Sequence, residues 1–429
     1  MSKLLMHLAD LRADPINWLA ALVFFTAAFF LTLKSTATTS LFLMFFICSW
    51  SIAKAPRCYF AARGPQFWVL ILCLLAPFLA EVLAQVGRGS FIGSSLDGPS
   101  RAILAAGVFI YLSKKDCTKL LSALGIGSAL GIVLVFLHLQ VFPEHYWGTR
   151  AATHFADPIT LPCYTFVLLG LYLFGDSSKT PTKVSNLIKL LISMLAIYIA
   201  IESRSRSAWV AGIALAELYL LYSFRASLTK QILSGLVLAF GVFAIFNSSD
   251  IFRYRTIEAY EGLVEFLDVG GGQSSSSGQR MILLLIDFEL IKDNLFFGVA
   301  DGVMPTFEYL KARIPSLSAH IYEIKTLAGS HSEMSAQLVR KGLFLGAFAL
   351  WGLFLYPFYF VSCKTRALSM ADLGPAAAIY GLIVPVLFSG LTIQVFNLKM
   401  TISFYMLCLA IILAYYFSRL KASEQGLKS

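Results

Sequence analysis

The sequence predicts an all-α polytopic membrane protein with about twelve transmembrane helices and a large, mainly helical loop between spans nine and ten. Hydrophobic residues make up 58% of the 429 residues and charged residues 14%, whereas soluble domains average about 45–50% and about 25%. Apolar runs close to the roughly 20 residues that cross a bilayer recur along the chain. One long polar connection, residues 248–340, interrupts them. The composition excludes an ordinary soluble enzyme and a disordered protein.

Twelve apolar runs are candidate spans. The fourth is short, and the others depend on length and hydropathy alone. We therefore expect spans one to nine in residues 1–247, a loop domain in 248–340, and spans ten to twelve with a tail in 341–429. The runs cover about 16–33, 36–53, 66–84, 101–113, 119–141, 158–174, 187–202, 207–223, 231–247, 342–361, 375–393 and 400–418.

The distribution of basic residues predicts the orientation. The chain carries a formal net charge of +10, and 18 of its 34 Lys and Arg lie at the termini and in alternate short connections. Short loops rich in Lys and Arg stay in the cytoplasm. We therefore expect both termini in the cytoplasm, the first run as a retained span, and the long loop on the opposite side. The positive charge is explained by this rule, so nucleic acid is not an expected partner.

The long loop contains a predicted hinge and a predicted helix. Gly270, Gly271, Gly272 and the run 274–278 form a Gly/Ser-rich hinge. Residues 280–297 predict a helix that is apolar nearly all round, with Asn294 and Gly298 supplying its end. The loop holds 8 basic and 12 acidic residues. Any anion site in it must therefore be local.

Arg204 and Arg206, interleaved with Ser203, Ser205 and Ser207, lie where the eighth span begins. A charge near hydrocarbon is costly unless it is paired or faces a watery cavity. A helix N-terminus adds free backbone N–H groups for an anion, and the guanidinium fork matches phosphate. The doublet therefore indicates a site for the phosphate of a lipid headgroup. The alternative is an interfacial arginine that only snorkels to the membrane surface.

His331 is the candidate general base. It stands between Ser330 and Ser332, on the loop side of span ten. An imidazole titrates near neutrality and can take a proton from a sugar hydroxyl. Glu333 follows two residues later, which on a helix directs it away from His331. The alternative is a purely structural histidine.

Several absences narrow the chemistry. The segment 34–40 has no DxD pair, and the chain has no HExxH, no GxSxG and no CxxC, only seven scattered cysteines. The sequence therefore predicts metal-independent chemistry without a cofactor, and neither a zinc site nor a disulfide framework. Glu217, inside span eight, keeps an ion-coupled or lipid-linked oligosaccharide transporter as an alternative from another class.

The ordered segments SRSRSAW, SGQR, DFELIKDNLFFGVADG and SHSEMSAQLVRKGLFLG resemble the O-antigen ligase and polymerase superfamily, as does the topology. The motif-bearing part is about residues 150–346. Within the superfamily the chain is most similar to the lipopolysaccharide O-antigen ligases. One departure is Ser332, where members often have Asn directly after the late histidine.

The resemblance implies an enzyme of the bacterial inner membrane that acts in its periplasmic loop. Its donor would be O-antigen on undecaprenyl pyrophosphate, and its acceptor lipid A-core oligosaccharide. His331 would be the base, with Arg280 and Arg206 holding pyrophosphate in an inverting glycosyl transfer. Candidates for binding pyrophosphate or sugar are Arg204, Arg150, Asp301 and Glu333. An O-antigen polymerase with the same donor is the nearest alternative.

Overall fold

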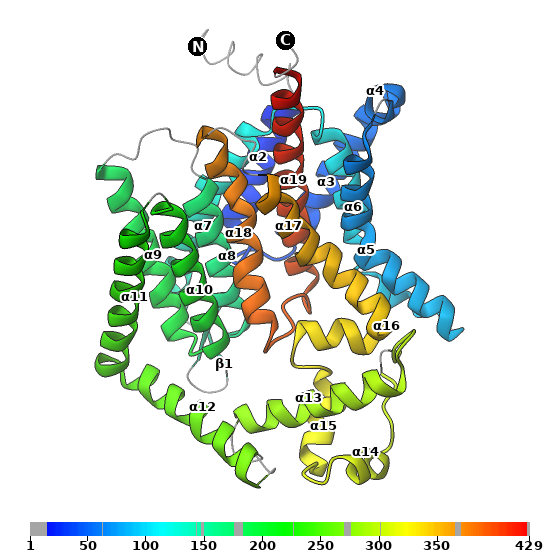
Figure 1. Ribbon diagram of the computed structural model, residues 1–429, viewed down its shortest axis with the longest axis vertical. Helices are drawn as coiled ribbons and strands as arrows, with labels where there is room; N and C mark the ends of the chain where they lie inside the picture. Colours follow the sequence, from blue (N-terminus) through cyan, green and yellow to red (C-terminus); the bar gives the residue numbers. More distant parts are fainter. Residues whose placement is uncertain are drawn as a thin grey trace.

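The computed structural model (Figure 1) is almost entirely helical over the part of the chain that it describes, which comprises residues 15–61, 63–142, 144–146, 150–175, 183–225, 227–269, 276–300, 302–364 and 370–426. The elements in order are α2 (Pro15–Phe29), α3 (Thr36–Lys54), α4 (Pro56–Phe60), α5 (Pro65–Arg88), η1 (Gly93–Leu96), α6 (Arg101–Leu112), α7 (Thr118–Val141), β1 (Glu144–Tyr146), β2 (Arg150–Ala152), α8 (Thr160–Gly175), α9 (Lys183–Glu202), α10 (Arg206–Ser223), α11 (Leu228–Ser248), α12 (Asp250–Val269), α13 (Ser276–Asp293), α14 (Phe307–Arg313), α15 (Ala319–Ala328), α16 (Glu333–Leu350), η2 (Trp351–Leu355), α17 (Tyr356–Lys364), α18 (Met370–Gly390) and α19 (Lys399–Gly426).

The predicted class is confirmed: the architecture is that of an all-α polytopic membrane protein. Each of the twelve predicted apolar runs coincides with a helix or with consecutive helices. Three apolar helices are shorter, at 15–29, 160–175 and 377–390. Seven helices within the described ranges are long and apolar enough to cross a membrane: Thr36–Lys54, Pro65–Arg88, Thr118–Val141, Val184–Glu202, Leu228–Ser248, Glu333–Cys363 and Lys399–Lys421.

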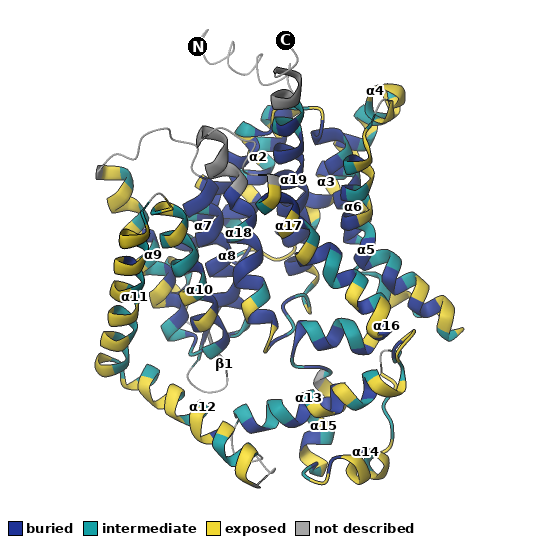
Figure 2. Ribbon diagram, viewed as in Figure 1, coloured by how far each residue is buried: buried dark blue, intermediate teal, exposed yellow. Residues whose placement is uncertain are grey.

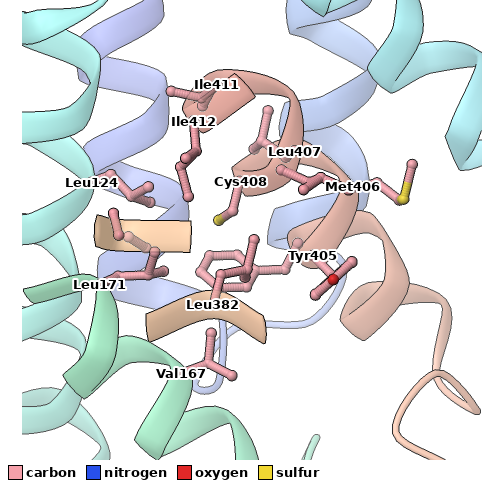
Figure 3. Packing of buried hydrophobic residues seen from close by; sticks show 14 of the residues in the cluster. Leu124, Val167, Leu171, Leu382, Tyr405, Met406, Leu407, Cys408, Ile411 and Ile412 are labelled. Carbon is pink, nitrogen blue, oxygen red and sulfur yellow. The ribbon is translucent and has the colours of Figure 1, made fainter. Parts of the chain in front are cut away.

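Helix α19 lies inside the bundle and organises it. Its residues 400–417 are mainly apolar and all buried, as a helix without an exposed polar face must be. Figure 3 shows its side chains packed against neighbours from three other helices. The labelled members of this cluster include Cys408, Ile411 and Ile412 of α19, Leu124 of α7, Val167 and Leu171 of α8, and Leu382 of α18.

Helix α11 has the opposite character. Its large apolar side chains point outward, with Leu236 at 62% and Phe240 at 72% exposure, and Figure 2 shows the helix as mainly exposed. A contiguous exposed apolar surface marks an interaction site, and on a helix of spanning length the natural partner is lipid. Helix α11 therefore has the surface of a lipid-facing helix.

The connection between α11 and α16 forms a helical unit of its own at the lower end of Figure 1. It contains α12, α13, α14 and α15. The last three share a second hydrophobic cluster with Val339 of α16, and Phe266 of α12 packs against this cluster. The cluster comprises Ile282, Leu283, Ile286, Leu290, Leu310, Ile314, Leu317, Ile321 and Val339.

Two details of this connection correct the sequence prediction. The helix predicted over 280–297 is α13, which begins earlier, at Ser276, and ends at Asp293. The predicted hinge residues 276–278 therefore form the first turn of a helix, while 270–275 lie outside the described residues. Asn294 donates through Nδ2 to the Leu290 carbonyl at 3.0 Å, and Gly298 takes a φ of +66°. Asn294 and Gly298 therefore follow the end of the helix as predicted, but the helix ends at Asp293, four residues before the predicted end at Phe297.

A short antiparallel hairpin of β1 and β2 interrupts the helical fold, with Tyr146 paired to Arg150. The all-α prediction did not foresee it. Strands of three residues carry too little alternation to be recognised in a sequence. The hairpin matters because β2 holds Arg150.

Gly342 makes the junction between the helical unit and the remainder of α16. Its φ of +80° breaks α16 at the residue where the predicted span begins. On either side, Leu343 N donates to Leu295 O at 2.7 Å, and Val299 N donates to Val339 O at 2.8 Å. A β-carbon at Gly342 would lie 2.5 Å from the carbonyl carbon of Phe296. Only glycine fits both this conformation and this approach.

A buried polar chain joins α5 to α16 beside that junction. Lys341 Nζ lies 3.5 Å from Glu81 Oε2 and donates to Gln337 Oε1. Gln337 donates in turn to Glu333 Oε1 at 2.7 Å. Glu81 also accepts from Gln85 Nε2 at 3.0 Å. Lys341 and Glu81 are 2% and 4% exposed, so each depends on the other to offset desolvation.

We predict that Lys341→Met destabilises the protein, because it leaves the Glu81 carboxylate buried without its lysine. Removing one partner of a buried ion pair costs about 3–5 kcal/mol. Glu81 keeps its contacts with Gln85 and with Arg88, whose Nη2 lies 4.0 Å from Glu81 Oε1, and these bring the loss toward the lower figure. The melting temperature of detergent-purified protein measures it.

The matched control is Lys399→Met, which breaks an ion pair between the exposed Lys399 and Asp97 and should cost about 0–1 kcal/mol. The double variant Glu81→Gln/Lys341→Met should recover most of the stability. Equal melting temperatures for the two lysine variants would contradict the interpretation.

Candidate functional site

Four arginines from different parts of the chain meet where the helical unit faces the bundle. Arg150 belongs to β2, Arg206 begins α10, Arg255 lies in α12 and Arg280 in the first turns of α13. Their charges are close enough that Arg255 lowers the pKa of each of the other three, and Arg206 lowers those of Arg150 and Arg280. Three of them were predicted site residues, whereas Arg255 was not singled out.

Arg206 connects α10 to the helical unit. Its Nη2 donates to Ser276 Oγ at 2.5 Å, and its Nη1 donates to the Arg255 carbonyl at 3.2 Å. Glu258 Oε2 lies 3.9 Å from Arg206 and 2.8 Å from Arg255. One carboxylate therefore stands beside two guanidinium groups. The remaining donors of the fork are available to an anion.

Arg150 braces the turn that starts α10. Its Nε donates to the Ser203 carbonyl at 3.0 Å and its Nη2 to the Arg204 carbonyl at 3.2 Å. Arg204 adopts a left-handed conformation with φ of +52°, which few non-glycine residues do outside functional or strained sites. The predicted helix start at Arg206 is confirmed. Arg204 itself contributes a backbone acceptor to this turn.

The group carries excess positive charge in a poorly hydrated place. Burial is the largest cause that lowers the pKa of Arg280 to about 10, and the charges of Arg206 and Arg255 lower it further. Burial likewise lowers the pKa of Arg150 to about 10, followed by repulsion from Arg255 and Arg280. Both remain cationic at neutral pH. Repulsion among desolvated cations is relieved by a bound anion, so the geometry favours an anionic ligand.

His331 lies beside this group, in the turn between α15 and α16. Burial lowers the pKa of His331 and the charge of Arg280 lowers it further, so the imidazole is neutral at neutral pH. Its Nδ1 is buried and has no hydrogen-bond partner among the described residues. A neutral imidazole with an unused nitrogen can accept a proton.

The turn around His331 is held from several sides. Gly329 has φ of +71° and ψ of −149°, a conformation essentially restricted to glycine. The loop between α18 and α19 forms the opposite wall: Ser332 Oγ donates to the Gly390 carbonyl at 3.0 Å, and Glu333 N donates to the Ile393 carbonyl at 2.9 Å. Gln394 Nε2 donates to the Ser330 carbonyl. No sequence motif pointed to this loop.

The two remaining predicted residues differ in status. Glu333 is buried, and its carboxylate accepts from Gln337 Nε2 at 2.7 Å and from the backbone N of Phe396 at 3.1 Å. It ties α16 to the loop before α19, and its predicted role in substrate binding stays a prediction. Asp301 lies outside the described residues. Within the described ranges, no three His, Cys, Asp or Glu side chains come together in a group that could hold a metal ion.

An apolar cavity of about 620 Å³ lies between α8, α9, α10 and α11. One end is lined by Trp209 and Phe252, whose rings stack with centroids 4.5 Å apart. Trp209 follows Arg206 by three residues, so it lies nearly one turn farther along the same face of α10. At the other end are Asn186 and Lys189. The cavity therefore runs along the helices and has one end next to the arginine group.

No model of a protein family matches this sequence, and no curated protein matches it significantly. The functional argument therefore proceeds from the residues and geometry described above.

Proposed function

We propose that the protein is a membrane glycosyltransferase that transfers O-antigen polysaccharide from undecaprenyl pyrophosphate to lipid A-core oligosaccharide. The observation that carries the proposal is the arginine group at one end of an apolar cavity, with a neutral histidine beside it. The guanidinium groups suit a pyrophosphate, the cavity suits part of a polyprenyl chain, and the imidazole suits an attacking hydroxyl. Pyrophosphate and a polyprenyl chain are the two non-sugar parts of a lipid-linked sugar donor, and the attacking hydroxyl belongs to the acceptor.

The proposed reaction is a direct displacement with inversion. The acceptor hydroxyl oxygen forms a bond to the anomeric carbon of the donor while the bond from that carbon to the pyrophosphate oxygen breaks. Arg206 and Arg280 stabilise the negative charge that gathers on the departing pyrophosphate, so they favour the transition state. His331 accepts the hydroxyl proton, a contribution of typically about 10²–10⁴-fold. The leaving group is already an anion and needs no general acid.

The proposed membrane arrangement has twelve spans, both termini in the cytoplasm of a bacterium and the site at the periplasmic face of the inner membrane. The twelve helical segments and the 18 cations in alternate short connections support it. In this arrangement Lys189, at the far end of the cavity, lies toward the cytoplasm. The donor tail would then extend from the arginine group into the bilayer.

A ligation assay tests the proposal directly. Full-length protein in detergent or liposomes is given the lipid-linked donor with either lipid A-core oligosaccharide or a second lipid-linked chain as acceptor. We expect transfer to lipid A-core, undiminished in excess chelator. Transfer only to the lipid-linked chain would identify a polymerase instead. Movement of donor across liposomes without a new glycosidic bond would identify a transporter, and loss of activity restored by Mg²⁺ or Mn²⁺ would contradict the metal-independent mechanism.

We predict that Arg206→Lys and Arg280→Lys each lower kcat by about tenfold or more, because lysine keeps the charge but loses the two-pronged fork. The initial rate of ligation at saturating acceptor measures the effect. The matched control is Arg253→Lys, on the exposed side of α12 and paired with Asp250, which should change the rate little. Unchanged rates in both site variants would contradict pyrophosphate binding by the fork.

We predict that the acid limb of the pH profile of kcat/KM lies below pH 6.5. The neutral imidazole is the active form, and burial together with Arg280 lowers the pKa of His331 from its usual 6.5. Activity is therefore retained below 6.5 and lost as pH falls through the lowered value. His331→Ala should lose both the limb and about 10²–10⁴-fold in rate. A folded His331→Ala protein with normal turnover would exclude His331 as the base.

A further inference from the structure

We infer that Asp287 is a positioning residue that fastens both flanks of His331 to α13, the helix that carries Arg280. The inference rests on the proposed function, because it assigns Asp287 the task of holding the base at a set place relative to the pyrophosphate site. Sequence analysis noted Asp287 only as one of several acids outside the spans.

The carboxylate of Asp287 is only 1% exposed and is fully engaged. Its Oδ1 accepts from Ser330 Oγ at 2.8 Å and from Lys325 Nζ, and its Oδ2 accepts from Ser335 Oγ at 2.5 Å. Ser330 precedes His331 directly, and Ser335 lies in the first turn of α16 behind it. The two oxygens therefore hold the chain on both sides of the imidazole.

The position of Asp287 along α13 links these contacts to Arg280. Arg280 and Asp287 are seven residues apart, which is close to two turns, so they share one face of the helix about 10.5 Å apart along its axis. The helix is rigid over this length and packs through Ile282, Leu283 and Ile286 against the second hydrophobic cluster. A carboxylate on this face thereby fixes the distance between the His331 turn and Arg280.

Lys325 of α15 offsets the desolvation cost of this buried carboxylate by pairing with it. Lys325 is 3% exposed and also donates to Ser330 Oγ at 2.9 Å. At the imidazole the two charges oppose each other, since Lys325 lowers the pKa of His331 and Asp287 raises it. The pair therefore acts on His331 through geometry more than through net charge. Displacing a catalytic group by 1 Å can lower the rate by about 10²-fold, so a residue that sets this position affects the rate strongly.

The test uses the full chain and two kinds of variant. Asp287→Asn keeps the size of the side chain but loses the charge and one acceptor. Ser330→Ala/Ser335→Ala removes both hydroxyl donors and leaves the buried Asp287–Lys325 pair intact. This second variant therefore tests the inference even if Asp287→Asn does not fold. The matched controls are Asp293→Asn, an exposed carboxylate on the same helix bonded to Tyr309 and Arg313, and Ser318→Ala, which caps α15.

Two measurements are made on each variant: kcat and KM for ligation, and the imidazole signal of His331 in ¹³C-histidine-labelled protein, assigned by its loss in His331→Gln. We expect the site variants to lower kcat by about 10- to 100-fold with little change in donor KM, and to replace one sharp His331 signal by several or a broadened one. The controls should stay within about twofold of the wild-type kcat.

Normal kcat and an unchanged His331 signal in the serine double variant would overturn the inference. A fall in rate that only follows the fraction of folded protein, with an unchanged signal, would also overturn it, because Asp287 would then be purely structural. If the wild-type protein shows no ligation, the proposed function fails, and the His331 signal still decides whether Asp287 positions the imidazole.

Discussion

The structure depends on the cost of keeping guanidinium groups away from water where the helical unit faces the bundle. A desolvated cation is stable only with an opposite charge or with hydrogen-bond acceptors. Here acceptors come mainly from backbone carbonyls, those of residues 203, 204 and 255, while Glu258 supplies the carboxylate that pairs with Arg206 and Arg255. Carbonyls orient the cations without neutralising them. The group is therefore held in place and still short of negative charge.

The elements that meet at this group are distant in sequence. The hairpin, the start of α10, α12 and α13 supply the arginines, and the turn before α16 supplies the histidine. Gly342 joins this assembly to the remainder of α16, and its positive φ lets residues 295–299 run alongside 339–343. The buried chain from Glu333 to Glu81 fixes the same junction to α5. The site is thus rigidly connected to the bundle on two sides.

Sequence patterns foretold the helices and several site residues, but not how they meet. Apolar runs are local and long, so all twelve were recognisable, and the serine-flanked arginines marked the start of α10. Arg255 and Gln394 gave no local signal, because their importance comes from contacts across about fifty and sixty residues. The three-residue strands were too short to recognise. The cavity beside Trp209 depends on the spacing of four helices, which no single segment encodes.

The loop between α18 and α19 has a consequence for how an acceptor would be handled. Together with Gly390 at the end of α18, its residues Ile393 and Gln394 hydrogen-bond to the segment 330–333, and it continues directly into α19, whose residues 400–417 are all buried. These contacts fix the backbone that carries the imidazole on both of its sides. In the proposed reaction, an acceptor would therefore have to place its hydroxyl oxygen at a position that the protein sets in advance. The choice of acceptor would then depend on the length and shape of its glycan and not on rearrangement of the protein.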